Sequence, residues 1–225
     1  MTKEKLLHPF VTVDIALFTM GEDGLKVLLV QRSEEPQARR WALPGGAIRP
    51  KVDVDLEAAA LRVLREKVGV EIAHLEEVRS FSGSKRDPRD WSVAMLYFAL
   101  LPKDRLHPDA LSKVDDWEWA DPAKPKRQMA FDHKEQLETA LARLRQKVQS
   151  HALPLHLMPR RFTLTELQRT CEAILGQRLD KSVFRRRLKG SRELIEVPGE
   201  FVRGSQRPAQ VYEAGEGLGF EAAAG

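Results

Sequence analysis

Cysteine is almost absent from this chain of 225 residues, which contains one, Cys171. A single cysteine excludes an internal disulfide and a metal site made of several thiolates. Its apolar neighbours have helical spacing, so we expect a buried core thiol. No apolar run approaches the ~18 residues that a membrane-spanning helix needs. The N-terminal segment carries Pro9 and Asp14 in its apolar stretch, unlike a secretion signal. We therefore expect a cytoplasmic protein without a membrane partner.

The chain as a whole also has no large excess of one charge. It contains 37 lysines and arginines and 33 acidic residues, which gives a net charge of +4. The basic residues are unevenly distributed, however. Between residues 159 and 215, twelve basic side chains outnumber seven acidic ones. This asymmetry indicates an anionic partner for the C-terminal part.

The length accommodates two average domains. Residues 151–160 contain Pro154 and Pro159 and are typical of a connection. We therefore expect one domain over residues 1–150, a linker over 151–160, and a second domain over 161–225 that ends in a frayed tail.

The N-terminal part has the pattern of an α/β fold. Apolar, β-branched runs at 10–20 and 25–32 flank the sequence GEDG, which predicts a hairpin. Residues 56–68 predict a helix that ends at Gly69, with Leu61, Leu64 and Val68 on its core stripe. Further expected elements are strands at 76–84, 91–101 and 113–122 and a closing helix at 133–148.

The C-terminal part predicts a winged helix-turn-helix. Thr163 and Glu166 form a capping-box pattern, and Phe162 with Leu167 can form its hydrophobic staple. The helix that follows should bury Leu164, Leu167, Cys171 and Ile174 and end at Gly176. Asp180 is a plausible N-cap for a second helix that ends at Gly190. A strand, a Pro198-Gly199 turn and a second strand would complete a two-stranded ribbon.

The second helix of this pair has two different faces. Val183, Phe184 and Leu188 can face the core while basic residues project away. Arginine can pair in two-pronged fashion with guanine or phosphate, which suits DNA recognition. An isolated basic helix is more often only a solvated surface, but this one follows a capped helix and a tight turn. The expected DNA-binding residues are Arg161, Thr163, Lys181, Ser182, Arg185, Arg186, Lys189, Arg203 and Arg207.

A loop and helix at residues 43–70 resemble the Nudix box, which is a glycine, five residues, Glu, seven residues, and Arg-Glu-aliphatic-x-Glu-Glu-x-Gly-aliphatic. Pro44-Gly45-Gly46 begins the match, and its later matching positions are Arg62, Leu64, Glu66, Gly69 and Val70. The first glutamate would fall on Val52 or Val54, depending on the end from which it is counted. The other two missing glutamates are Val63 and Lys67.

These departures affect the metal chemistry that the resemblance implies. Nudix hydrolases use Mg²⁺ or Mn²⁺, hard cations that take oxygen ligands, to polarise a diphosphate. Lys67 would repel such a cation, and Glu66 alone is a weak ligand. Asp53, Asp55 or Glu57 could supply a shifted ligand and rescue hydrolysis. We expect no catalytic residues and no required metal, with Mg²⁺ needed only if hydrolysis persists.

The whole chain is similar to the NrtR family, Nudix-related transcriptional regulators of NAD metabolism. The resemblance spans about residues 10–213 and rests on VLLVQRSEEP, WALPGGAI, RDPRD, AFDH, FTLTELQ, LDKSVFRRR and RPAQVY. It implies an α/β/α sandwich with a mixed sheet followed by a winged helix, a homodimer on operator DNA, and release by ADP-ribose. The implied ligand-binding residues are Arg32, Arg40, Trp41, Gly45, Gly46, Arg86, Asp87, Arg89, Phe131 and His133.

Three alternatives stay open at this point. The protein could be an active ADP-ribose pyrophosphatase with an accessory winged helix, or a sugar-catabolism regulator of the same architecture. The winged helix could also bind a protein rather than DNA. Trp41, for its part, could be a core aromatic rather than a ligand contact.

Overall fold

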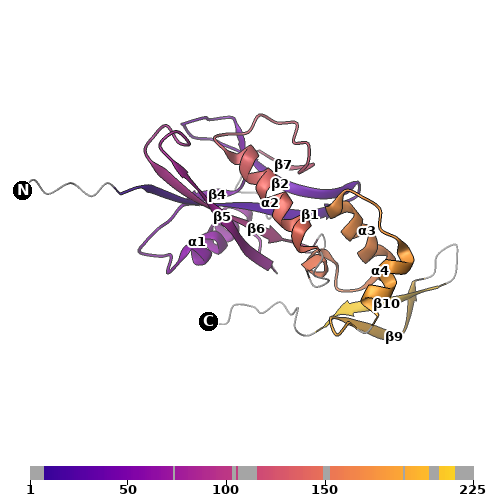
Figure 1. Ribbon diagram of the computed structural model, residues 1–225. Coiled ribbons are helices and arrows are strands. Elements are labelled where there is room, and N and C mark those ends of the chain that lie inside the picture. Colours follow the sequence, from indigo (N-terminus) through magenta and orange to yellow (C-terminus); the bar gives the residue numbers. More distant parts are fainter. Residues whose placement is uncertain are drawn as a thin grey trace, which may run out of the picture.

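Figure 1 shows a computed structural model of the chain. The structure describes residues 8–72, 74–102, 105, 116–148, 153–189, 191–202 and 208–215. No helix in these ranges is long and apolar enough to cross a membrane.

The N-terminal part contains a mixed sheet, as the family resemblance implies. The first two strands form the predicted hairpin, with Gly21 opposite Gly24, and the first strand runs parallel to β6 while its other neighbours are antiparallel to it. The order is β3-β2-β1-β6-β5, with β4 beside β1 and β7 beside β2. The strands are β1 (Phe10–Gly21), β2 (Gly24–Gln31), β3 (Trp41–Ala42), β4 (Gly45–Ala47), β5 (His74–Gly83), β6 (Ser92–Leu100) and β7 (Trp117–Ala120).

Helices cover both faces of this sheet, which makes it an α/β/α sandwich. Successive side chains of a strand point to opposite faces. Along β1, Ile15 and Leu17 therefore face the helix α1 (Leu56–Val63). Ala16 and Phe18 face the helix α2 (His133–Lys147), which crosses the opposite face (Figure 1).

The helix after the glycine loop differs from its expected packing. Asp55 caps α1 by accepting from the Ala58 N–H, and a π-helical turn, η1 (Leu64–Val68), continues it to Gly69 at φ 72°. Leu61 was expected in the core but is partly exposed, whereas Val63 is fully buried. The small Ala59 and Ala60 let the helix lie close to the sheet, which brings the side of the helix that carries Val63 inward.

The C-terminal part is a winged helix. The helices α3 (Leu164–Leu175) and α4 (Lys181–Leu188) pack with a three-stranded sheet of order β8-β10-β9. Its strands are β8 (Phe162–Thr163), β9 (Leu194–Val202) and β10 (Ala209–Ala214). The capping box at Thr163 and Glu166 is present, and α3 ends at Gly176 with φ 70°. Asp180 caps α4 as predicted.

The expected turn at Pro198-Gly199 is wrong, because both residues lie inside β9. Phe201 pairs with Gln210 and Glu196 pairs with Tyr212, so β9 carries extra residues between these pairs and bulges there. Gln210 Nε2 donates to the carbonyl oxygens of Val197 and Glu200, which stabilises the bulge. The proline therefore sits where no regular ladder bond is required of it. The connection to β10 falls at 203–207, outside the described residues.

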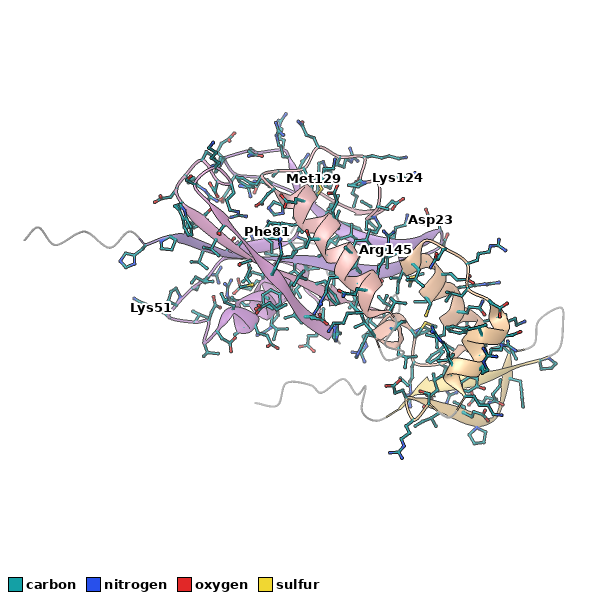
Figure 2. All side chains as sticks on the ribbon, in the orientation of Figure 1. Asp23, Lys51, Phe81, Lys124, Met129 and Arg145 are labelled. Carbon is teal, nitrogen blue, oxygen red and sulfur yellow. The ribbon has the colours of Figure 1, made fainter. Side chains whose placement is uncertain are left out.

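The two parts share an apolar core. Leu153, Leu155 and Leu157 of the 3-10 helix η3 (Leu153–Leu157) are buried in one cluster with residues of α2 and α3. Arg145 on α2 donates from Nε to the carbonyl oxygen of Ile174 on α3, 2.9 Å away; Figure 2 labels this arginine. The proline-containing segment after 152 thus packs between the two parts.

Candidate ligand pocket and nucleic-acid interface

A cavity of about 500 Å³ opens beside β1, β2 and the loop that enters β4. Its walls bring together eight of the ten ligand residues expected from the sequence: Arg32, Gly45, Gly46, Arg86, Asp87, Arg89, Phe131 and His133. The volume is in the usual range for small-molecule sites, which is about 300–1,000 Å³. Segments far apart in the sequence therefore form one concave polar site.

The structure does not place Arg40 and Trp41 in the wall of this cavity with the other eight. Trp41 is 6% exposed and belongs to the core on the α2 side of the sheet. Its ring packs under the Arg127 guanidinium, 4.8 Å from the ring centroid. Ala42, the next residue of β3, lines the cavity instead, because successive side chains of a strand face opposite ways.

The two glycines of the loop permit close packing. A Cβ on Gly45 would collide with the Asp14 carboxylate and lie 2.9 Å from the Val13 carbonyl oxygen. A Cβ on Gly46 would lie 3.3 Å from Val63 Cγ2. Both glycines therefore let the loop lie against β1 and α1.

Two arginines of the cavity are paired with carboxylates. Arg86 donates from Nε and Nη2 to Asp132, both at 3.0 Å. Burial acts to raise the pKa of Asp132, but the hydrogen bonds from Arg86 and Gln136 lower it overall. Arg89 donates to Asp87 at 2.7 Å and stacks on the Phe10 ring. These pairs hold the wall of the cavity in place.

Arg32 has a different environment. Its guanidinium lies 4.8 Å from the centroid of the Phe131 ring and donates to the carbonyl oxygens of Glu34 and Pro36. Burial lowers its pKa, and the charge of Arg89 adds to this effect. Among the described residues, no carboxylate lies within ion-pair distance of it. Asp87, Asp14 and Glu34 attract its charge only from farther away, so an anion in the cavity can still pair with it.

His133 at the start of α2 contacts the loop that leads to Gly45 and Gly46. Its Nδ1 accepts a hydrogen bond from the Leu43 N–H at 3.1 Å. Burial lowers the pKa of this histidine, which keeps the acceptor neutral at physiological pH. The ring therefore orients the glycine loop while it forms part of the cavity wall.

The box positions that hold the metal in Nudix hydrolases, and the acidic residues near them, do not fit a divalent cation. Glu66, the weak metal candidate, is instead paired with Arg49 at 2.9 Å and with Arg62 at 3.5 Å. Asp53 accepts two hydrogen bonds from Arg62, and these bonds are the main reason that its pKa is lowered to about 2. Asp55 is used as the N-cap of α1.

Val63 contributes no oxygen, and Glu57 is exposed on α1. None of the five residues of this comparison lines the cavity; they are Asp53, Asp55, Glu57, Val63 and Glu66. In the part of the chain that the structure describes, no three His, Cys, Asp or Glu side chains gather as a metal site. No step of hydrolysis through a metal can be assigned to these residues.

The sequence did not indicate that Lys67 lines the cavity. It lines the cavity, and its Nζ donates to the Gly45 carbonyl oxygen at 2.6 Å. Asp14, Phe10 and Thr12 also line the cavity and were missed. The alternation of β1 places Thr12 and Asp14 on the same side, a signal that the sequence does contain.

The exposed face of α4 matches the expected cationic surface. Phe184 and Leu188 are buried, whereas the residues of the basic face are exposed: Lys181, Ser182, Arg185, Arg186 and Lys189. Val183 was expected inside but is 41% exposed. A helix turns by roughly 100° per residue, so Val183 lies off the line that joins Phe184 to Leu188.

The other DNA-binding candidates have different positions. Thr163 is buried and caps α3, so its side chain is not available to DNA. Arg161 pairs with Glu200 at 2.7 Å and with Glu213 at 3.1 Å, which ties it to β9 and β10. Arg203 and Arg207 lie outside the described residues.

An α/β/α sandwich with a polar cavity, joined to a winged helix with a basic exposed helix, defines a two-part ligand-responsive regulator. Comparison with known proteins places the parts in families. Residues 8–140 match the NUDIX domain, and residues 154–214 match the NrtR DNA-binding winged helix domain. The chain belongs to the NrtR family of Nudix-related transcriptional regulators.

Three relatives illustrate the likeness. The chain is 44% identical to the "ADPR responsive transcriptional repressor NtrR" of Acinetobacter baylyi, over 91% of this chain and 81% of that protein. Shewanella oneidensis NrtR complexed with a 27mer DNA is 37% identical, with a TM-score of 0.83 over 91% of this chain and 93% of that one. The NUDIX domain of the same Shewanella protein complexed with ADP ribose is 36% identical, with a TM-score of 0.55 over 64% and 94%.

Proposed function

We propose that this protein is a DNA-binding repressor of genes for NAD biosynthesis or salvage, and that ADP-ribose in the cavity releases it from DNA. One observation carries the proposal: a single chain joins a cationic cavity without a fitting metal patch to an exposed basic helix. The named properties of the Acinetobacter and Shewanella relatives support it.

DNA binding is assigned to α4. Its capped N-terminus and its buried Phe184 and Leu188 fix the helix on the domain, while Arg185 and Arg186 extend outward. An arginine can donate two hydrogen bonds to a guanine edge or to phosphate oxygens. A homodimer would place two such helices on half-sites about 34 Å apart.

The cavity is assigned to the effector. ADP-ribose carries a diphosphate, a ribose at each end of it and an adenine base. Arg32 and Lys67 offer cations to the diphosphate, and the rings of Phe10 and Phe131 offer apolar surfaces to a base or a ribose. Hydrolysis is not part of the proposed function, and no metal is required.

Release requires that ADP-ribose bind the conformation of low DNA affinity more tightly than it binds the conformation of high DNA affinity. α2 and the segment after it connect the cavity to the winged helix: Asp132 at the start of α2 holds Arg86, and Arg145 near its end bonds to α3. A small rotation of the sandwich, transmitted through α2, would change the spacing of the two copies of α4 in a dimer.

A gel shift on the DNA upstream of this gene and of neighbouring operons, repeated with ADP-ribose, NAD and pentoses, tests the proposal. Release by ADP-ribose supports it. Release by pentoses would favour a sugar-catabolism regulator, and the absence of salt-dependent DNA binding would favour a protein partner. Mg²⁺-dependent release of AMP from ADP-ribose would favour a hydrolase.

A further inference from the structure

Four cationic side chains line the cavity, and they fall into two classes. Arg86 and Arg89 are each paired with a carboxylate, as described above. Arg32 and Lys67 donate only to carbonyl oxygens in the described part of the chain. Asp14 and Glu34 attract both side chains without pairing with either at ion-pair distance, so an anionic ligand can still pair with them directly.

The side chains at the altered end of the Nudix box point in different directions. Glu66 turns toward Arg49 and Arg62, and Val63 turns into the core. Lys67 reaches back to the glycine loop and contributes to the cavity wall. The box thus presents an ammonium to the cavity, while its remaining carboxylate is engaged elsewhere.

The loop leaves room at this ammonium. A Cβ on Gly46 would lie 3.8 Å from Lys67 Nζ and 4.0 Å from its Cε. Because Gly46 has no side chain, a ligand oxygen can approach the backbone and the ammonium together. The bond to Gly45 uses one of the three hydrogens of the ammonium, so two donors are left for a ligand.

We propose that the Lys67 ammonium binds the diphosphate of the ligand directly and takes over the charge neutralisation that a divalent cation gives in metal-dependent relatives. Ligand binding is then independent of metal and depends on the diphosphate charge. The inference rests on the proposed function, because it assigns a residue to the diphosphate of that same ligand.

Calorimetric titration of the full-length protein tests this assignment. ADP-ribose, adenosine and inorganic pyrophosphate are titrated separately, in EDTA and in Mg²⁺. Lys67→Gln removes the charge but keeps a donor for the Gly45 carbonyl, and Lys67→Arg keeps the charge. Lys51→Gln is the matched control, because Lys51 is an exposed cation outside the cavity wall.

EDTA should leave the affinity of the wild-type protein for ADP-ribose unchanged. Lys67→Gln should weaken ADP-ribose binding by about 10-fold or more, as expected for the loss of a charge-assisted hydrogen bond, and should weaken pyrophosphate binding too. Adenosine binding should change less than 2-fold, and Lys67→Arg should retain most of the ADP-ribose affinity.

A purely structural lysine would instead weaken adenosine and ADP-ribose equally, and that result would overturn the inference. So would wild-type binding that disappears in EDTA, or pyrophosphate and ADP-ribose affinities that Lys67→Gln leaves unchanged. If the wild-type protein binds pyrophosphate through Lys67 but not ADP-ribose, the proposed effector fails while the role of Lys67 stands.

Discussion

Lys67 Nζ donates a hydrogen bond to the carbonyl oxygen of Gly45 across 2.6 Å. This bond joins the helix of the Nudix box to its glycine loop through an ammonium, at a place where metal-dependent hydrolases require ligands for a cation. The neighbouring positions have structural uses: Val63 fills the core and Glu66 pairs with arginines. The box therefore retains its architecture while its charge is reversed on the cavity side.

The burial of Val63 predicts that a glutamate cannot simply be restored there. Val63→Ala should lower the free energy of unfolding by roughly 1–3 kcal/mol, as for the loss of buried methyl groups. Val63→Glu should cost more, because it buries an unpaired carboxylate. Urea denaturation measures both variants, and a Val63→Glu protein as stable as wild type would contradict the packing described for α1.

The capping box of α3 predicts a stability effect at Thr163. Thr163→Ala should lower the free energy of unfolding by about 1 kcal/mol, because the N–H of Glu166 loses its partner. Thr163→Ser keeps the hydroxyl and should remain close to wild type. Thermal denaturation followed by circular dichroism distinguishes them, and equal melting temperatures for all three proteins would argue against the cap.

The exposed face of α4 predicts loss of operator affinity at Arg185 and Arg186. Alanine at either position should cost roughly 1–3 kcal/mol if that arginine contacts a base. Lys51→Ala removes one cation at the end of the molecule away from α4 (Figure 2) and should leave affinity nearly unchanged. Fluorescence anisotropy with labelled operator measures this, and unchanged affinity in both arginine variants would exclude α4 as the reading helix.

The bond from Arg145 to Ile174 predicts a defect in coupling rather than in binding. Arg145→Ala should leave calorimetric ADP-ribose affinity within about 2-fold, yet shift the ADP-ribose concentration needed for DNA release by about 5-fold or more, a typical coupling energy. Arg143→Ala is the control, since Arg143 on the same helix pairs with Glu76 of β5. Equal shifts in the two variants would contradict a specific role of the Arg145 contact.

His156 predicts a loss of stability in mild acid. Burial, with a smaller contribution from the nearby His74, lowers its pKa from 6.5 to about 4, and the two rings stack with centroids 4.8 Å apart. As the pH falls, His156 is protonated in the unfolded chain before it is protonated in the folded protein. The contribution of the neutral ring to the free energy of unfolding is therefore complete above pH 6.5 and declines as the pH falls from 6.5 toward 4.

The expected decline is about 1 kcal/mol at pH 5, after allowance for partial exposure of the ring. His156→Gln should flatten the dependence of melting temperature on pH between 7 and 5. His8→Gln, at an exposed histidine, should not flatten it. His74, whose pKa burial also lowers, remains in both variants, as does the ion pair of 2.9 Å between Glu76 and Lys147 that acts on it. A curve that His156→Gln leaves as steep as wild type would contradict the buried neutral ring.

The sequence predicted the features that depend on local rules. The hairpin, the capping box, the Gly176 stop and the α4 cap each follow from a few adjacent residues, and each is present. Prediction was poorer where contacts between distant residues determine the backbone conformation. Pro198-Gly199 would suit a turn, but the amide of Gln210 stabilises a bulge there instead.

The site shows the same division. The family resemblance indicated eight of the residues that line the cavity, but the direction in which Trp41 points depends on which side of β3 packs against the core. Lys67 was predicted only as a residue that repels metal, because its proximity to Gly45 arises from the approach of two segments 22 residues apart. Such long-range proximity leaves no local pattern in the sequence.

The most direct test of metal-free effector sensing titrates ADP-ribose into the complex of the full-length protein with labelled operator DNA, in EDTA, with anisotropy as the readout. AMP release is followed in a parallel sample with Mg²⁺. We expect ADP-ribose to dissociate the complex in EDTA, with no AMP formed above a protein-free blank when Mg²⁺ is present. DNA that stays bound at saturating ADP-ribose, or rapid AMP release with Mg²⁺, would contradict a repressor that senses ADP-ribose without hydrolysing it.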